Sequence, residues 1–493
     1  MAGPGIDGFS TATATLRALR ARQVSALELL ELYRRRIERY NPQLNAIVVQ
    51  SLDRAQRQAE AADAARVRGE ERALLGLPVT LKESINVRGL PTTVGMPDWR
   101  EARAEADAPA AQRIQAAGAV LLGKTNIPPM LADWQADNVI YGRSNNPWDL
   151  TRTPGGSTGG GAAALAAGLA TLEVGSDIGG SIRVPAAFCG VYGHRPSDSA
   201  LPRSGQFPFP AIPNPLTIMG VQGPLARSAE DLELALDVLA GPEGGEETAW
   251  RLAIPQARHE HLRDFRVAVL PPIDWVPVDL EILAAQDALL AYLRRAGVQV
   301  NVVQPEGFGD LRAHHRLYHC LLAAITGARN SEAERQRLAE LWSTQEDEFA
   351  QAVRCGLLAS LGDYFLWYGQ REQYRAAYRA FFREWDVLLA PITLTPAFPH
   401  LTIAWPRDAA AITQTLDVSG RAVPYALQLV YPGLATLSGQ PATALPVGLT
   451  RAGLPIGLQV IGPYLEDRTP IRFAALIARE FGGYHSPPGY AEE

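Results

Sequence analysis

The chain has 493 residues, of which 47% are hydrophobic and 20% charged, and its formal net charge is −6. This composition is typical of a globular protein and lacks the excess positive charge that favours binding to nucleic acid or an anionic membrane. No apolar run approaches the roughly 18 residues of a transmembrane helix, and the N-terminus lacks the regions of a signal peptide. The three cysteines have no CxxC spacing. We therefore expect a cytoplasmic protein without a disulfide framework or a thiolate zinc site.

Helices and short apolar strands alternate along the first half of the chain. The first seventy residues are predicted to be helical, with a capping-box pattern at Ser25 and Glu28. Strand-length apolar runs occupy 77–81 and 119–122. The other predicted elements are a helix over 107–118, a small-residue helix over 159–170, a strand over 171–176 and a helix over 228–241.

The second half continues this alternation. Its predicted elements are strands at 266–270, 298–303, 386–391, 442–448 and 455–462, with a helix over 279–296. Strands alternating with helices indicate an α/β protein in which helices cover a sheet. We find no internal repeat and no long linker.

The region from about 305 to 385 is predicted to be mostly helical and is rich in aromatic residues. Aromatic residues at helical spacing are more often core than pocket, so we expect most of them to pack, although the group could wall a substrate cleft. They are Tyr364, Phe365, Trp367, Tyr368, Tyr374, Tyr378, Phe381, Phe382 and Trp385. The proline-rich segment 204–217 is predicted to be a structured loop.

The most informative pattern is the glycine- and serine-rich stretch 152–190. A phosphate-binding loop would need a GK[ST] sequence, and none follows. The segment GGSTG matches the GxSxG pattern of a nucleophile elbow, but that turn follows a strand, and Pro154 argues against one. An elbow also needs a histidine base, and none of the eight histidines lies in an informative context. His315 and His319 have the spacing of metal ligands, yet packing is the favoured interpretation.

A third interpretation uses two serines and a lysine. Only two of the 46 lysine and arginine residues are lysines, Lys82 and Lys124. Arginine cannot give up its proton in a protein, whereas a lysine whose pKa is lowered by burial can act as a general base. Ser157 and Ser181 lie among glycines, and consecutive N–H groups near Ser181 could bind an oxyanion.

These residues belong to a longer set of motifs through which the chain resembles the amidase signature family of serine hydrolases. The motifs are LPVTLKESINVRGLPTT, AGAVLLGKTNIP, YGRSNNPWDLTRTPGGSTGG, VGSDIGGSIRVPAAFCGVYGHRPS, GPLARSAEDL, SGQPATALPVG and GLPIGLQVIGP, in the family's order. The resemblance implies one α/β/α sandwich domain over 1–493 with a large mixed central sheet, and no metal or organic cofactor. We expect N-terminal helices at about 10–70, a signature core at about 72–240, the helical substrate-side region at about 305–385 and a C-terminal core at about 386–480.

The resemblance also implies a role for each matching residue. Ser181 matches the nucleophile, Ser157 the bridging serine that follows a cis peptide bond, and Lys82 the base. The backbone N–H groups that match the oxyanion hole are those of Ile178, Gly179, Gly180 and Ser181. The supporting positions are Gly156, Thr158, Asp177 and Arg183, of which the last two could equally form a structural ion pair.

Three positions depart from the family pattern. Thr158 stands where a serine is usual, and His194 and Arg195 stand in GHRPS where the family usually has GLKPT. We expect all three to affect packing more than chemistry. Lys124 matches a motif whose role in the family is structural.

The resemblance implies an amidase that cleaves linear amides through an acyl-enzyme. The apolar and aromatic content and the negative charge favour a neutral, hydrophobic or aryl substrate, as in an aryl acylamidase. Carbamates, as in a urethanase, and esters are alternatives for the same triad. An A-type amidotransferase chain that works with partner chains on charged tRNA, or a non-catalytic binding protein, would be a different class. We expect a small-molecule amide or carbamate as the partner, no nucleic acid or membrane, and a monomer or homodimer.

Overall fold

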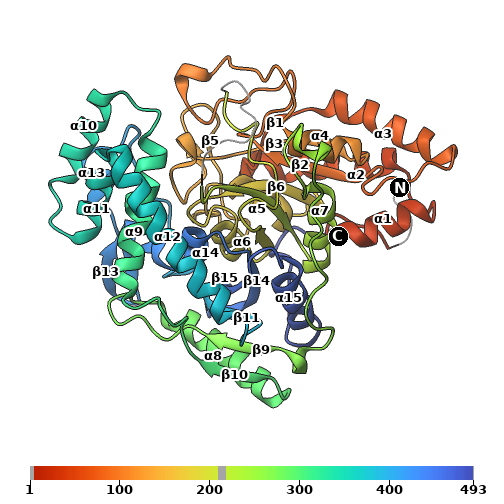
Figure 1. The fold of residues 1–493 in the computed structure, drawn as a ribbon. Helices are drawn as coiled ribbons and strands as arrows, with labels where there is room; N and C mark the ends of the chain where they lie inside the picture. The colour runs from red at the N-terminus through yellow and green to blue at the C-terminus, as the bar shows by residue number, and fades with distance from the viewer. Residues whose placement is uncertain (1–4, 209–217, 492–493) are drawn as a thin grey trace.

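An 11-stranded mixed β-sheet forms the centre of the protein (Figure 1). The computed structural model describes residues 5–208 and 218–491. The strands follow the order β1-β3-β2-β6-β8-β7-β14-β15-β11-β9-β10. They are β1 (Ile47–Gln50), β2 (Pro78–Lys82), β3 (Val120–Thr125), β6 (Leu172–Asp177), β7 (Tyr192–Arg195), β8 (Val221–Ala226), β9 (Arg266–Val269), β10 (Gln299–Val302), β11 (Val387–Pro391), β14 (Ala442–Leu449) and β15 (Pro455–Ile461).

The sheet is parallel in two places and antiparallel between them. Strands β3, β2 and β6 run parallel, as do β10, β9 and β11, whereas β6 through β15 pair antiparallel. Two small two-stranded sheets lie outside it, formed by β4 (Asp137–Asn138) with β5 (Gly142–Arg143) and by β12 (Thr415–Val418) with β13 (Arg421–Pro424). This mixed α/β sheet confirms the predicted fold class, and the predicted strands are present with ends shifted by a few residues.

Helices cover the sheet. The small-residue helix α5 packs against β2, β3, β6 and β8, and α6 packs against β7, β14 and β15. The N-terminal helices α1 to α3 and the helices α9 to α12 lie at opposite sides of the molecule (Figure 1). The helices are α1 (Ala12–Arg20), α2 (Ala26–Leu44), α3 (Leu52–Val67), α4 (Pro109–Ala116), α5 (Gly159–Ala166), α6 (Arg183–Cys189), α7 (Ala229–Leu239), α8 (Leu280–Arg295), α9 (Leu311–Gly327), α10 (Glu332–Trp342), α11 (Glu348–Leu357), α12 (Leu361–Phe381), α13 (Ala409–Thr413), α14 (Val430–Ser438) and α15 (Arg468–Glu480).

The N-terminal region differs from the prediction in one element. Ser25 and Glu28 form the predicted capping box at the start of α2. The helix ends where Asn45 adopts a left-handed conformation, and the β-branched residues that follow form β1, which pairs antiparallel with β3. The prediction of a fully helical segment over the first seventy residues is therefore wrong, because Asn tolerates the left-handed conformation that ends a helix.

The region 305–385 is helical as predicted, through α9 to α12, and most of its aromatic residues pack against the core, as expected. Tyr378, Phe381 and Phe382 are buried in the second half of α12. In its first half, Tyr364 and Trp367 are partly buried against a second core cluster, which includes Tyr318, whereas Phe365 retains 64% of its accessible surface. The aromatic residues therefore pack at both ends of the helix, and Phe365 is the clear exception.

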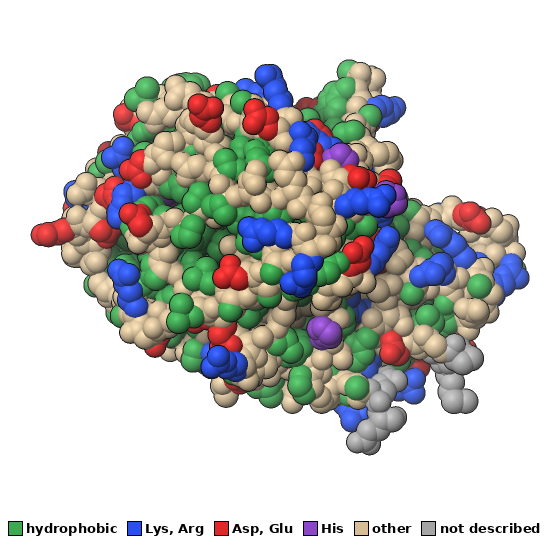
Figure 2. Space-filling model, turned by 90° about the horizontal axis from the view of Figure 1, so that it is seen from below, with side chains coloured by type: hydrophobic (Ala, Val, Ile, Leu, Met, Phe, Trp, Pro, Cys, Tyr) green, Lys and Arg blue, Asp and Glu red, His purple; other side chains and the backbone are tan. Residues whose placement is uncertain are grey.

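Two surface features bear on the predictions. On the face seen in Figure 2, acidic and basic side chains are interspersed. No helix within 5–208 and 218–491 is both long and apolar enough to cross a membrane. Most of the predicted loop 204–217 lies outside the described residues, but its start contacts the segment that follows Lys82: Gln206 bridges to Ile85, and the Phe207 N–H donates to the Ser84 carbonyl.

Candidate active site

Lys82 is the last residue of β2 and is fully buried. Its Nζ donates to the Ser157 hydroxyl at 2.7 Å and to the Ser176 hydroxyl at 3.0 Å. The Ser176 carbonyl lies 3.4 Å from the same nitrogen. Burial lowers the pKa of Lys82 to about 7, although the carboxylates of Asp177 and Glu173 raise it. A lysine in this setting can hold a neutral amine near neutral pH.

Ser157 lies in a tight glycine loop before α5. The Gly156–Ser157 peptide bond is cis, as predicted from the family resemblance. A Cβ on Gly155 would lie 2.6 Å from the Pro185 Cα, and one on Gly156 would lie 2.6 Å from the Asp133 carbonyl oxygen. Glycine is required here because other backbone segments occupy the space that a side chain would need.

Ser181 lies in the loop between β6 and α6, beside the Ser157 loop. The Thr158 N–H donates to the Ser181 carbonyl at 3.1 Å, which ties the two loops together. Ser181 is 5% exposed, and its hydroxyl makes no hydrogen bond to the part of the chain that the structure describes. Gly180 next to it has a φ of +92°, so the turn that presents Ser181 needs glycine at this position.

Asp177 and Arg183 form a fully buried ion pair beneath this loop, with an Nη2–Oδ1 distance of 3.0 Å. Burial would raise the pKa of Asp177, but the Arg183 guanidinium holds that pKa well below its usual range. The Asp177 carboxylate also accepts from the N–H groups of Gly180 and Ile182 at 3.0 and 3.1 Å. The pair therefore shapes the loop that would carry the nucleophile, and no hydrogen bond among the described residues joins either side chain to the Ser181 hydroxyl.

The four N–H groups that the family resemblance assigned to an oxyanion hole are not equivalent. The Gly180 N–H is engaged by Asp177, so it is not free to bind an oxyanion, and this part of the prediction needs correction. The N–H groups of Ile178, Gly179 and Ser181 have no hydrogen-bond partner among the described residues. Three N–H groups, rather than four, are available on this loop.

The carbonyl groups of the loop are held by other elements, and this orients the free N–H groups. The Tyr318 hydroxyl of α9 donates to the Ile178 carbonyl at 2.8 Å, and the Trp134 indole N–H donates to the Gly179 carbonyl at 2.9 Å. The N–H and C=O of one trans peptide point in opposite directions, so fixing the carbonyl of Ile178 fixes the N–H of Gly179. Segments 130–141 and 305–385 thus both reach the nucleophile loop.

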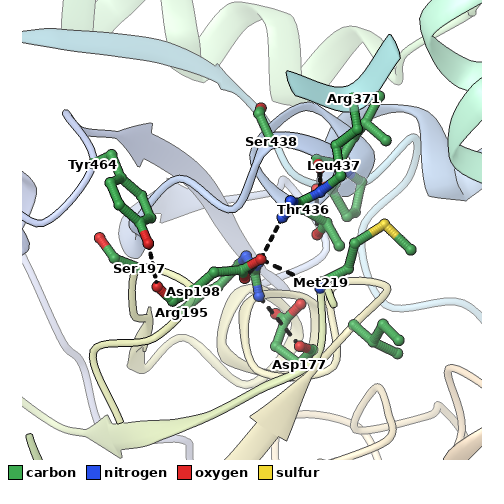
Figure 3. A network of polar contacts seen from close by, with 12 residues as sticks. Asp177, Arg195, Ser197, Asp198, Met219, Arg371, Thr436, Leu437, Ser438 and Tyr464 are labelled. Atoms are coloured by element: carbon green, nitrogen blue, oxygen red, sulfur yellow. Dashed lines mark hydrogen bonds and ion pairs between the residues drawn. The ribbon is translucent and has the colours of Figure 1, made fainter. Parts of the chain in front are cut away.

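Arg195 holds the start of the same loop through the polar network of Figure 3. Its Nη1 donates to the Asp177 carbonyl at 3.3 Å, and its Nη2 pairs with Asp198 at 2.9 Å. Asp198 also pairs with Arg371 of α12. The sequence predicted only a packing role for Arg195, but the residue links the loop to the helical region. His194 does pack: its ring nitrogens contact Thr443 and Asp467.

Sequence reasoning missed Glu173, a fully buried residue of β6. Its Oε1 accepts from the Thr125 hydroxyl at 2.7 Å, and burial raises the pKa of Glu173 to about 7. The sequence pattern identifies 171–176 only as a strand. Glu173 could have been identified as a candidate, because it is the single acidic residue in a predicted strand that is otherwise apolar or small. A buried carboxyl group is costly and is therefore often retained for a function.

The remaining candidates lie apart from these residues. His315 and His319 are buried on α9, with their Nε2 atoms 3.0 Å apart, and pack against Phe349. No group of three or more His, Cys, Asp or Glu within the described ranges could hold a metal ion. Lys124 is buried on β3, where its Nζ donates to the Thr92 hydroxyl at 2.9 Å and to the Pro91 carbonyl.

Comparison with known proteins identifies the family to which the chain belongs. Residues 28–470 match the family model for amidases. The chain is 32% identical over 490 residues to the A chain of the glutamyl-tRNA(Gln) amidotransferase of Koribacter versatilis (strain Ellin345), covering 95% of this chain and 97% of that protein. It is 33% identical over 488 residues to a putative amidase, AmiB2, of Mycobacterium tuberculosis (strain ATCC 25618 / H37Rv), covering 95% and 96%.

Among solved structures, 6-aminohexanoate cyclic dimer hydrolase superposes with a TM-score of 0.79 at 28% identity, covering 98% of this chain and 99% of that one. The match to the family model spans most of the chain, and the relatives match it almost from end to end. The chain belongs to the amidase signature family.

Proposed function

We propose that this protein hydrolyses the C–N bond of a small amide, with Ser181 as nucleophile, Ser157 as proton relay and Lys82 as general base. The observation that carries the proposal is the 2.7 Å contact between the Lys82 Nζ and the Ser157 hydroxyl, in a fully buried setting beside the Ser181 loop. A serine hydroxyl is a weak nucleophile without a base, and a desolvated lysine supplies one.

In the first half of the reaction, the Ser181 oxygen attacks the amide carbonyl carbon. Its proton passes to the Ser157 oxygen as the Ser157 proton passes to the Lys82 amine. The negative charge that develops on the substrate oxygen is stabilised by the free N–H groups of Ile178, Gly179 and Ser181.

In the second half, the C–N bond breaks and the proton returns from Lys82 through Ser157 to the leaving nitrogen. The acyl group remains as an ester on Ser181. Water then attacks this ester, loses its proton along the same route and releases the carboxylic acid. The Ser181 hydroxyl is regenerated, so the chemistry needs water as the only second reactant.

An apolar or aryl substrate is the best supported class. The cluster of Met219, Leu317, Tyr318, Leu321 and Leu437 adjoins Ile178 and Leu429 at the nucleophile loop. Ile178 and Leu429 are the partly buried members at the Ser181 loop, and apolar side chains there favour a neutral hydrophobic group over a charged one. Carbamates and esters present the same carbonyl group to Ser181 and are alternative substrates. The protein is proposed to act as a monomer or homodimer, without nucleic acid.

Service as the A chain of an amidotransferase is the second candidate function. It is favoured by the similarity to the A chain of a glutamyl-tRNA(Gln) amidotransferase. Such a chain depends on partner chains, whereas an amidase acts alone. We expect the isolated chain to hydrolyse simple amides without ATP, tRNA or another protein.

The test is an assay of the purified chain on p-nitroacetanilide, p-nitrophenyl acetate and a p-nitrophenyl carbamate. We expect turnover that is lost in Ser181→Ala, with the matched variant Ser84→Ala as a control that alters a buried serine outside the triad. Hydrolysis that persists in Ser181→Ala would refute the acyl-enzyme. Activity that arises only when partner chains are added would favour the amidotransferase.

A further inference from the structure

A buried carboxyl group near Lys82 takes no part in the proposed triad. Glu173 is fully buried at the second residue of β6. Its Oε1 accepts from the Thr125 hydroxyl at 2.7 Å, whereas its Oε2 has no hydrogen-bond partner within the described part of the chain. The Thr80 hydroxyl also acts on this carboxyl group and lowers its pKa. A buried carboxyl group with so few hydrogen bonds is costly to stability, so its retention calls for a functional reason.

The order of the strands places this carboxyl group beside Lys82. Strand β2 lies between β3 and β6, so the Glu173 side chain crosses β2 to reach Thr125. The register pairs Glu173 with Thr80 and pairs Thr125 with Lys82. Paired residues on neighbouring strands point to the same face. The carboxyl group therefore crosses β2 between the side chains of Thr80 and Lys82.

The surroundings leave few charged groups that could act on Lys82. Helix α5 covers the carboxyl group so closely that a Cβ on Gly161 would lie 2.6 Å from the Glu173 Oε1. Neither α5 nor β8 carries a charged side chain. The only other carboxylate that acts on Lys82 within the described residues is Asp177, which is already paired with Arg183. Glu173 is the one carboxyl group there without a cationic partner of its own among those residues.

We propose that Glu173 is a positioning residue for Lys82: its carboxyl group sets the charge of the lysine amine and stabilises the ammonium that forms when Lys82 accepts the proton from Ser157. This inference rests on the proposed function. Burial raises the pKa of Glu173 and lowers that of Lys82, in each case to about 7, and each group favours the charged form of the other.

The test is the pH dependence of the rate at which a fluorophosphonate inactivates the protein. This rate reports the reactivity of Ser181, and its measurement does not require a known substrate. Glu173→Gln keeps the shape of the side chain and an acceptor for the Thr125 hydroxyl but removes the negative charge. Loss of an anion lowers the pKa of a neighbouring lysine. We therefore expect the acidic limb of the rate profile to move to lower pH by about 1 unit. An acidic limb that coincides with that of the wild type would overturn the proposal.

Two further variants complete the design. Thr125→Val removes the hydroxyl group that donates to the Glu173 carboxyl group. We expect the acidic limb of its rate profile to be displaced from the wild-type position. If Glu173→Gln does not fold, Thr125→Val alone decides whether Glu173 acts on Lys82. Asp231→Asn is the matched control, because Asp231 is a buried carboxylate that accepts from the N–H groups of Ala12 and Thr13. We expect its acidic limb to stay at the wild-type position.

The outcome separates this inference from the proposed function. If Ser181→Ala and Lys82→Met react with the fluorophosphonate as fast as the wild type, the triad itself is refuted. If those two variants are inert while Glu173→Gln and Thr125→Val keep the wild-type limb, the triad stands and only the role of Glu173 fails.

Discussion

The two lysines of this chain occupy neighbouring strands, and the difference between their sites explains why Lys82, and not Lys124, is proposed as the base. Lys82 and Lys124 are both fully buried. The β2–β3 register pairs Lys82 with Thr125 and Leu81 with Lys124, so the two amines point to opposite faces of the sheet. Burial lowers the pKa of Lys82 to about 7 and that of Lys124 to about 8.

Their hydrogen-bond partners differ more than their burial does. Lys82 contacts two hydroxyl groups, those of Ser157 and Ser176, in addition to the Ser176 carbonyl, and a hydroxyl can donate a proton to a neutral amine. Lys124 contacts one hydroxyl, that of Thr92, and the carbonyl of Pro91, which can only accept. The proposed role of Lys82 therefore depends on desolvation together with a hydroxyl donor, that of Ser157, beside the Ser181 loop.

The largest expected effect is on turnover and separates the two lysines. Lys82→Met should lower kcat/KM by roughly 10³-fold, because it removes the proton acceptor. Lys124→Met should retain turnover per folded molecule but lose about 1–3 kcal/mol of stability, because the Thr92 hydroxyl and the Pro91 carbonyl lose their donor. Steady-state kinetics and urea unfolding measure the two effects. Equal losses of turnover in Lys82→Met and Lys124→Met would contradict the proposed difference between the two lysines.

The next largest effect, about tenfold on kcat, is expected for Tyr318, through which α9 contacts the Ser181 loop. Tyr318→Phe removes the donor to the Ile178 carbonyl and frees the Gly179 N–H to rotate. We expect kcat to fall about 10-fold with little change in KM, less than the loss typical of a direct oxyanion donor. Tyr378→Phe is the control, since that buried hydroxyl donates to the Leu434 carbonyl elsewhere. A KM effect without a kcat effect would argue for substrate binding instead.

The pH dependence of stability should report both lysines. Each has a folded-state pKa below the ordinary lysine value of 10.5, so between about pH 7 and 10.5 the unfolded chain binds more protons and stability rises with pH. Each lysine contributes up to about 1.4 kcal/mol per pH unit within its window. Urea unfolding across this range should give a shallower slope for Lys82→Met and for Lys124→Met. An unchanged slope would mean that the replaced lysine is protonated in the folded state.

The smallest expected effect concerns the Lys124 site alone. Thr92→Val removes one hydroxyl acceptor from Lys124, and we expect a loss of about 1 kcal/mol in the free energy of unfolding. Thr92→Ser keeps the hydroxyl and should recover most of that loss. A fall in kcat/KM for Thr92→Val would show that the two faces of the sheet are coupled.

Much of this arrangement could be predicted from sequence, and the failures have physical causes. The alternation of helices and strands located most of the sheet, and the resemblance to the amidase signature family grouped Lys82, Ser157 and Ser181. Glu173 was missed because its neighbour Thr125 is distant in sequence and becomes adjacent only through the strand order. The engagement of the Gly180 N–H by Asp177 depends on loop geometry, which residue types do not determine.

In the aromatic region 305–385, too, the sequence pattern does not determine which side chains are buried. Its helical content followed from periodicity, but the burial of each side chain depends on where α12 leaves the core. Phe365 is 64% exposed although Phe381, on the same helix, is buried. The Tyr318 hydroxyl donates to the Ile178 carbonyl, which is 140 positions away in the chain, so the sequence pattern does not indicate this contact.

Direct titration of the two lysines tests the central claim that Lys82 is a neutral base. The chain has only two lysines, so protein labelled with ¹³Cε-lysine gives two side-chain signals, and Lys82→Arg assigns them. We predict that the Lys82 signal titrates with a pKa near 7. A Lys82 signal that shows a protonated amine up to the ordinary lysine pKa of about 10.4 would contradict this claim.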